Sequence, residues 1–354
     1  MRNKYEIVGL PWAHGSGTNV SDCKTSREVM EKANLDWTVN KCPVVARMPA
    51  TLDSMRTLNP NNNDFVYGGD VYRDCPNGFA TYRTDLDVPL GFVKSKYEVV
   101  QNTDAFSFFD DAIGTDKAVW QYAGYFGFGH KIYVAAKLPV DIVVGNDKID
   151  NYLVFSNSHD GSSSVDILFT PIRVFCLNTL NSAIKNADSH IRLRHTKSVK
   201  DRINRGAEVL RIACTHAATT QILYNSLLTM KMTDKEVMKY LAQLQLNDNE
   251  IQNLEEFDKE NGYKKLMYKD YLTLERTNIS TRKANIISSM FDYYLDGIAQ
   301  KHILGTAWGA YNAVTGYYSN VANLEGERRT EGLLWGGANN MMNKALERVM
   351  LQAA

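Results

Sequence analysis

The sequence predicts an α+β fold. We expect an antiparallel β-sheet with one or two helices in residues 1–195 and a helical region in residues 196–354 that packs on it. Up to about residue 195, short runs of apolar residues alternate with polar ones and are separated by glycine- and asparagine-rich turns, which is typical of strands joined by hairpins. Beyond residue 196, apolar residues recur every three or four positions, which is typical of amphipathic helices.

The N-terminal half contains eleven candidate strands and two candidate helices. The spacing predicts helices over 25–34 and 103–113, the second capped by Asn102. Turns are expected at the asparagine-rich segment 59–64 and at Pro76-Asn77-Gly78. The strands are expected at 37–39, 44–48, 65–67, 71–72, 79–83, 90–93, 119–126, 131–138, 140–144, 151–156 and 165–175.

The C-terminal half contains a series of candidate helices. They are expected at 199–227, 235–244, 266–275, 282–300, 307–320 and 337–351, with residues 247–262 as an acidic connector. The segment 305–313 is rich in glycine and alanine, so on a helix it would allow a neighbouring backbone to approach closely.

The composition excludes several classes of protein. Lys and Arg total 40, as do Asp and Glu, so any site for nucleic acid must come from local clustering of charge. The five cysteines are widely spaced and form no CxxC pair, which argues against a disulfide framework and a zinc site. No apolar run approaches the length of a membrane span, and the N-terminus has no apolar leader. We therefore expect a cytoplasmic protein without a membrane partner.

One segment departs from the overall charge balance. Residues 185–211 hold eight Lys or Arg against three Asp or Glu. If residues 191–195 form a strand, Arg192 and Arg194 share one face, where they suit phosphate oxygens. A solvated basic face is an equally good explanation, whereas ion pairing on the following helix does not account for Arg192, Arg194 and Lys197, which precede it. The candidate nucleic-acid contacts of this cluster are Arg173, Arg192, Arg194, His195, Lys197, Lys200 and Arg202.

Aromatic residues lie beside basic ones in the candidate hairpins. Single-strand binders stack bases on aromatic rings next to a charged groove. Tyr82, Arg83 and Tyr97 are therefore added to the candidate site, although aromatic residues in strands commonly just pack a sheet.

The sequence holds no catalytic or metal-binding motif. None of the seven histidines forms an HxH, HExxH or HxxxH pair, so we expect no metal and no cofactor. The alternative is an enzyme with a dispersed site built from His159, Asp160, Cys176 and His195. We expect no catalysis, because a buried inert cysteine and a polar turn explain these residues better.

Eight segments carry a resemblance to a known family. They are PWAHGSGT (11–18), LDWTV (35–39), YRTD (82–85), LGFVKSKYEVVQN (90–102), NSHDGSSS (157–164), TPIRVFCLNTLN (170–181), IRLRHT (191–196) and GTAWGAYNAVTGYY (305–318). With these segments the chain resembles the DUF932 family of phage- and plasmid-borne proteins of unknown function. The resemblance implies a mobile-element setting, without an assigned activity or catalytic residues. The family usually has Trp-His after the first proline, whereas this chain has Trp12-Ala13-His14, so no role is transferred to His14.

A weaker resemblance concerns the order of elements. A strand, the helix over 103–113, several antiparallel strands and a long helix look like the βαβββα core of Rad52-type single-strand annealing proteins, some of which phages carry. That analogy implies rings or filaments, hence a homo-oligomer.

Two functions are consistent with these observations. The first is a non-enzymatic protein that binds nucleic acid, single-stranded DNA above all, in recombination, annealing or protection of replicating DNA. The alternative is a protein-interaction module that inhibits or recruits a host factor and has no affinity for nucleic acid.

Overall fold

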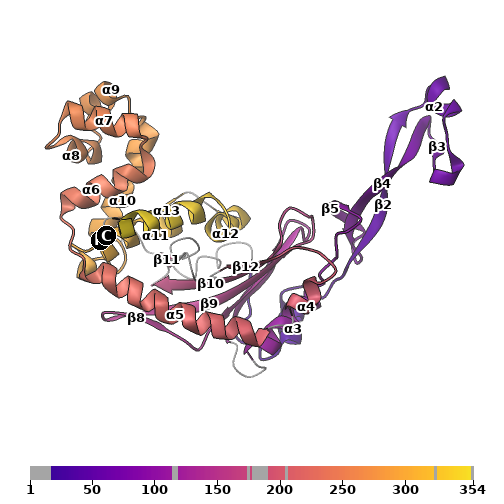
Figure 1. Cartoon of the computed structure of the whole chain (residues 1–354), viewed down its shortest axis with the longest axis horizontal. Coiled ribbons are helices and arrows are strands. Elements are labelled where there is room, and N and C mark those ends of the chain that lie inside the picture. The colour runs from indigo at the N-terminus through magenta and orange to yellow at the C-terminus, as the bar shows by residue number, and fades with distance from the viewer. Residues whose placement is uncertain are drawn as a thin grey trace.

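The computed structural model describes residues 17–113, 119–173, 176–177, 190–203, 206–322 and 325–351. The predicted α+β class is confirmed, with antiparallel sheets mainly in the N-terminal half and helices in the C-terminal half. The elements form a cradle, in which a large sheet is the base (Figure 1). A β-ribbon arm rises from one end of the base and a group of helices from the other.

The large sheet has eight strands in the described part of the chain, and all its pairings are antiparallel. Its main path runs β1-β6-β7-β9-β10-β11, while β12 pairs with β10 and β8 pairs with β9. The register places Tyr133, Ser156, Asp166 and Arg192 in one row across four strands. The strands are β1 (Thr18–Asn19), β6 (Val119–Phe126), β7 (Lys131–Lys137), β8 (Ile142–Val144), β9 (Asp147–Ser158), β10 (Val165–Arg173), β11 (Cys176–Leu177) and β12 (His190–Leu193).

Both faces of this sheet are covered. On one face, α1 (Ser26–Lys32) and α3 (Asn102–Ile113) bury Phe109 against Trp120 and Phe155. On the other face, α12 (Gly326–Leu334) and α13 (Gly337–Leu351) bury apolar side chains against Tyr152 and its neighbours. Because each face packs on a different group of helices, the strands show near-continuous burial rather than strict alternation.

A second sheet forms the arm. It consists of β2 (Val39–Pro49), β3 (Phe65–Tyr67), β4 (Asp70–Arg83) and β5 (Val88–Lys94), with α2 (Leu52–Arg56) and a 3-10 turn (Pro60–Asn62) at the far end. The turn predicted at Pro76-Asn77-Gly78 is wrong, since β4 runs through it with Asn77 in the left-handed region at φ 67°. The predicted strands 37–39 and 44–48 are likewise one strand, which has a bulge between Pro43 and Val45.

The C-terminal helices surround one central helix, α11 (Ala307–Asn320), whose residues are nearly all buried. The predicted close approach is confirmed, because a Cβ at Gly309 would lie 2.3 Å from the Ile303 carbonyl oxygen and one at Gly316 would lie 2.0 Å from the Tyr293 ring. The other helices are α4 (Val199–Ile203), α5 (Gly206–Thr229), α6 (Asp234–Gln245), α7 (Asp248–Phe257), α8 (Gly262–Met267), α9 (Tyr271–Thr277) and α10 (Thr281–Asp296), with a 3-10 turn at Lys301–Ile303.

Besides the short helices α2 and α8, two helices of the C-terminal half were not expected from the sequence. The acidic connector predicted at 247–262 contains α7, because Asn247 and Glu250 form a capping box at its start. Helix α12 is the other, and its apolar residues Leu333 and Leu334 pack on the large sheet. No helix in the described ranges is long and apolar enough to cross a membrane.

Candidate nucleic-acid interface

A buried polar cluster joins the arm to the large sheet. We call it the junction cluster; it comprises Trp37, Arg83, Tyr97, Asn102, His159 and His195. His159 directly follows β9 and is fully buried. Its Nε2 lies 2.9 Å from Asn102 Oδ1. The Asn102 amide nitrogen donates to the carbonyls of Leu35 and Trp37, at 2.9 and 3.3 Å, which fixes Oδ1 as the acceptor for His159 Nε2–H.

Asn102 therefore has a different role from the predicted helix cap. Its side chain faces away from the first turn of α3 and bonds to the chain segment before β2. Asp104 instead accepts from the Gln101 backbone nitrogen at 2.8 Å. The sequence pattern Asn-Thr-Asp indicates a helix start, but the partner of a buried asparagine depends on which segment packs against it.

The buried His195 and the half-buried Tyr97 form a second pair. Their rings are stacked with centroids 4.4 Å apart. His195 Nδ1 donates to the Glu98 carbonyl at 3.0 Å, and the Tyr97 hydroxyl donates to the Ser158 carbonyl at 2.6 Å. Burial lowers the pKa of His195 and raises the pKa of Tyr97. Because both side chains are held by protein groups, the predicted contacts of His195 and Tyr97 with nucleic acid are not supported by this geometry.

Arg83 is also engaged within the protein. Its side chain is only 3% exposed, and its guanidinium binds Asp85 through two nitrogens at 3.0 and 2.6 Å. The guanidinium carbon also lies 4.3 Å from the centre of the Trp37 ring. This arrangement indicates that Arg83 stabilises the arm rather than contacting phosphate. Tyr82, on the opposite side of the strand, is half-buried.

The remaining basic residues lie at the edge of the large sheet. Strand β12 pairs with β10, and the Arg192 side chain is 63% exposed while its Nε lies 3.0 Å from Asp166. Arg194 and Lys197 follow it and are exposed, without an ion pair to the described residues. Lys200 on α4 pairs with Asp104 at 3.2 Å. The side chains of Arg173 and Arg202 lie outside the described residues.

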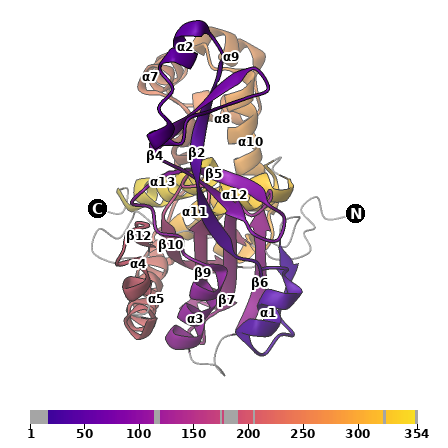
Figure 2. The same cartoon turned by 90° about the vertical axis from the view of Figure 1, so that its right-hand side faces the viewer.

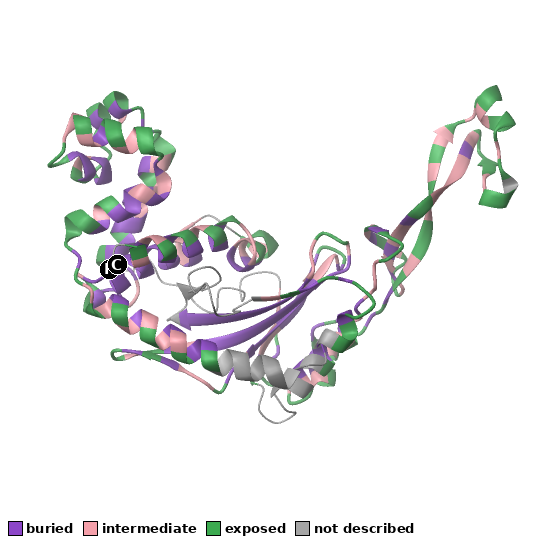
Figure 3. Ribbon diagram, in the orientation of Figure 1, coloured by how far each residue is buried: buried purple, intermediate pink, exposed green. Residues whose placement is uncertain are grey.

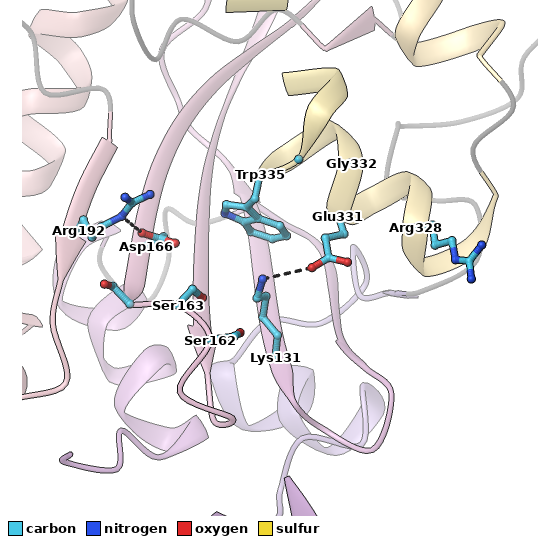
Figure 4. Close-up of a pocket in the computed structure, with 11 residues that line it drawn as sticks. Lys131, Ser162, Ser163, Asp166, Arg192, Arg328, Glu331, Gly332 and Trp335 are labelled. Carbon is cyan, nitrogen blue, oxygen red and sulfur yellow. Dashed lines mark hydrogen bonds and ion pairs between the residues drawn. The ribbon is translucent and has the colours of Figure 1, made fainter. Parts of the chain in front are cut away.

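A pocket of about 590 Å³ lies beside Arg192, between the large sheet and α12 (Figure 4). The serines of the turn between β9 and β10 form one wall and the Trp335 ring another. Lys131, on β7, lies 3.4 Å from Glu331 and 5.2 Å from the centre of the Trp335 ring. The lining residues are Lys131, Ser162, Ser163, Ser164, Asp166, Arg192, Arg328, Glu331, Gly332, Trp335 and Gly336.

The family model for DUF932, a domain of unknown function, matches residues 89–346. The chain belongs to the DUF932 family. No curated protein and no solved structure is found to match it.

In this DUF932 protein, several of the segments that carry the resemblance meet at the junction cluster. LDWTV supplies the carbonyls that Asn102 binds, and LGFVKSKYEVVQN supplies Asn102 and Tyr97. NSHDGSSS supplies His159, and IRLRHT supplies His195. Strand β5 passes so close to this turn that a Cβ at Gly91 would lie 2.3 Å from the Asp160 carbonyl oxygen. The residues of PWAHGSGT up to position 16, with His14, lie outside the described residues.

The alternative of a dispersed catalytic site receives no geometric support from His159 and Asp160. His159 binds Asn102, whereas the Asp160 carboxylate binds Ser158 and the Ser162 backbone. Although burial raises the pKa of Asp160, the hydrogen bonds from Ser158 and Ser162 leave it below its ordinary value. The Cys176 side chain lies outside the described residues. Within the described ranges, no three His, Cys, Asp or Glu side chains gather to hold a metal ion.

The sequence pattern predicted the basic edge but not the pocket. Trp335, Lys131 and Glu331 come from α12 and β7, and the last two are 200 positions apart. The serine run 162–164 was the one local signal, since a polar turn after a strand often lines a site.

Proposed function

We propose that this DUF932 protein binds single-stranded nucleic acid at the edge of the large sheet. The observation that carries the proposal is that Arg192 borders both the pocket lined by Trp335 and the exposed side chains of Arg194 and Lys197. Arginine and lysine side chains at a strand edge suit a phosphate backbone. A pocket with an aromatic wall and hydroxyl groups suits one unstacked base.

The preference for a single strand follows from the size and chemistry of the pocket. About 590 Å³ lies within the range of pockets that take a small ligand such as one nucleotide. A base in a duplex is stacked and paired, so it enters such a pocket only after unstacking at a cost of a few kcal/mol. A single strand avoids that cost. The three basic residues of the pocket outnumber its two acidic ones, which favours an anionic ligand.

The first experiment is fluorescence-anisotropy titration with labelled single- and double-stranded oligonucleotides at two salt concentrations. We expect salt-sensitive binding with preference for the single strand. With single strands, the double variant Arg194→Ala/Lys197→Ala should make the slope of log K against log salt less negative by about 1.4, since each lost phosphate contact removes about 0.7. Lys24→Ala/Lys301→Ala removes the same charge from exposed positions elsewhere and should leave the slope unchanged.

The pocket is tested separately through Trp335. Trp335→Ala should weaken single-strand binding by about 1–3 kcal/mol at every salt concentration, because base stacking does not depend on counterions. Trp335→Phe keeps a stacking surface and should retain most of the affinity. The absence of binding to either oligonucleotide at low salt would refute the proposal.

A biological role in strand annealing on a phage or plasmid is a further part of the proposal. It rests on the resemblance of the element order to annealing proteins and on the family setting. The assay is the rate at which two complementary labelled strands pair with and without the protein, and a rate unchanged by the protein would leave binding or protection of single strands as the role.

A further inference from the structure

The tip of the arm exposes an apolar surface. We call it the arm tip; it comprises Leu52, Met55, Phe65, Val66 and Tyr67, whose exposed fractions range from 44% to 76%. Helix α2 buries no residue at all, and none of the hydrophobic clusters in the described residues includes an arm-tip side chain. Figure 3 shows the exposed character of this end of the ribbon. Large apolar side chains exposed together on a projecting element favour a docking site.

The lack of burial has a structural cause. At this end the arm is a single layer of β2, β4 and β3, with no helix packed on either face of the ribbon. Among the described residues strand β3 pairs only with β4, so within that part of the chain its other edge, beside Phe65 and Tyr67, has no strand partner. Such an edge is usually protected by charge or by a partner. Here the edge residues are apolar, which favours a partner.

The helices at the other end of the cradle form a complementary surface. We call it the helical-arm pocket; it has a volume of about 440 Å³ between α6, α8 and α10. Tyr268 lines it with 75% of its surface exposed, and the neighbouring Tyr271 is 78% exposed. The apolar and aromatic lining residues are Met238, Tyr263, Tyr268, Phe291 and Leu295.

Both surfaces also carry charges of both signs. The helical-arm pocket is bordered by two acidic residues, Asp234 and Glu260, and two basic ones, Lys235 and Lys264. All four are exposed and form no ion pair with the described residues. On the arm tip, α2 carries one exposed charge of each sign, Asp53 and Arg56. The charged side chains of the arm tip can therefore pair with opposite charges at the border of the helical-arm pocket. Interfaces commonly have such a polar rim around an apolar centre.

We propose that the arm tip of one copy docks into the helical-arm pocket of a second copy. The two surfaces lie at opposite ends of one chain and rise on the same side of the large sheet (Figures 1 and 2), so a chain cannot fill its own pocket. Because the formal net charge is zero, electrostatic repulsion between identical copies is weaker than it would be at a large net charge. Such a contact joins two different surfaces, so repeating it produces a ring or a filament. The inference does not depend on nucleic-acid binding.

The test compares two variants with charges placed in exposed positions, where folding is least affected. The tip variant is Leu52→Asp/Tyr67→Asp, and the pocket variant is Tyr268→Asp/Tyr271→Asp. The control is Phe128→Asp/Ile222→Asp, which alters exposed apolar residues elsewhere. Molar mass is measured by size-exclusion chromatography with light scattering over a range of protein concentrations, and circular dichroism checks the fold.

We expect the wild type and the control to exceed the 39.9 kDa monomer mass, increasingly with concentration. Each docking variant alone should elute as a monomer. A mixture of the two should form a 1:1 dimer and nothing larger, because only one competent tip and one competent pocket remain.

Three results would overturn the proposal. The first is a wild type that is monomeric at every concentration, which would leave the tip for a host protein or for no partner. The second is a tip variant that is monomeric while the pocket variant still assembles like the wild type, which would indicate tip-to-tip pairing through β3. The third is a mixture of the two variants that stays monomeric.

Discussion

His159 and Asn102 form a buried hydrogen bond of 2.9 Å between two segments that are 57 positions apart. Asn102 also binds the chain before β2, so one side chain links the large sheet, α3 and the base of the arm. The Thr81 hydroxyl adds a bond of 2.7 Å to the His159 carbonyl. The orientation of the arm relative to the sheet therefore depends on a small number of buried polar contacts.

We expect Asn102→Ala to destabilise the protein strongly. The substitution leaves His159 Nε2–H and two buried carbonyl groups without their partner, and each such group costs about 1–3 kcal/mol. The free energy of unfolding, measured by urea denaturation and circular dichroism, should fall by about 3 kcal/mol. Asn61→Ala, at an exposed position of the arm, should change it by less than about 0.5 kcal/mol. Equal stabilities of the two variants would contradict the linking role of Asn102.

Stability should fall as the pH is lowered from 6.5. Burial lowers the pKa of His159 to about 3, with a further contribution from His195. The unfolded chain, with an ordinary histidine pKa near 6.5, therefore binds a proton between these values that the folded protein does not. The stabilising effect of keeping His159 neutral is complete above pH 6.5 and declines by about 1.4 kcal/mol per pH unit below it.

The measurement is urea unfolding at several pH values between 6.5 and 4.5. His159→Gln can still donate a hydrogen bond to Asn102 but does not titrate, so its stability should depend less steeply on pH than that of the wild type. Burial lowers the pKa of His216 to about 4, so part of the pH dependence should remain.

We expect Arg83→Lys to affect stability and not nucleic-acid binding. Lysine keeps the charge but loses the two-nitrogen contact with Asp85 and the stacking on Trp37. The free energy of unfolding should fall by about 2 kcal/mol, a value typical of lost charged hydrogen bonds. The affinity for oligonucleotides should stay within twofold of the wild type. Reduced affinity with unchanged stability would instead place Arg83 in the interface.

Asp166→Asn should strengthen the binding of single strands. Asp166 has a buried carboxylate that holds Arg192 at the edge of the pocket and competes with phosphate for it. Removing this negative charge should raise the affinity about fivefold, equivalent to about 1 kcal/mol. Asp150→Asn removes a carboxylate that pairs with Lys137 at another part of the sheet and should have no effect. An unchanged affinity in Asp166→Asn would exclude Arg192 from the phosphate contacts.

Much of the fold could be predicted because its signals are local. The strand over 119–126 and the helix over 307–320 have the bounds that the hydrophobic pattern indicates. The predictions were wrong where a local sequence signal is compatible with two different structures. Pro76-Asn77-Gly78 is typical of a turn, but pairing with β2 and β5 on either side keeps β4 extended around it.

The candidate site was less predictable than the fold. Alternation predicts a strand face shared by Arg192 and Arg194, but β12 ends at Leu193, so Arg194 follows the strand; both residues are exposed. Arg83 and His195 belonged to the same predicted site. The sequence could not show that both are buried against aromatic rings. Exposure depends on which segments pack together, and this information is absent from a run of a few residues.

The sequence by itself determined the α+β class, the order of most elements and the position of the basic edge. These depend on periodicity and charge within about 20 neighbouring residues. The tertiary structure decided the partners of Asn102, the pocket beside Trp335 and the apolar surfaces at the two ends of the cradle. The first two bring together side chains 50 to 200 positions apart along the chain, such as Asn102 with His159 or Lys131 with Glu331. Contacts at that separation depend on the topology of the whole sheet, because chain connectivity alone does not bring such residues together.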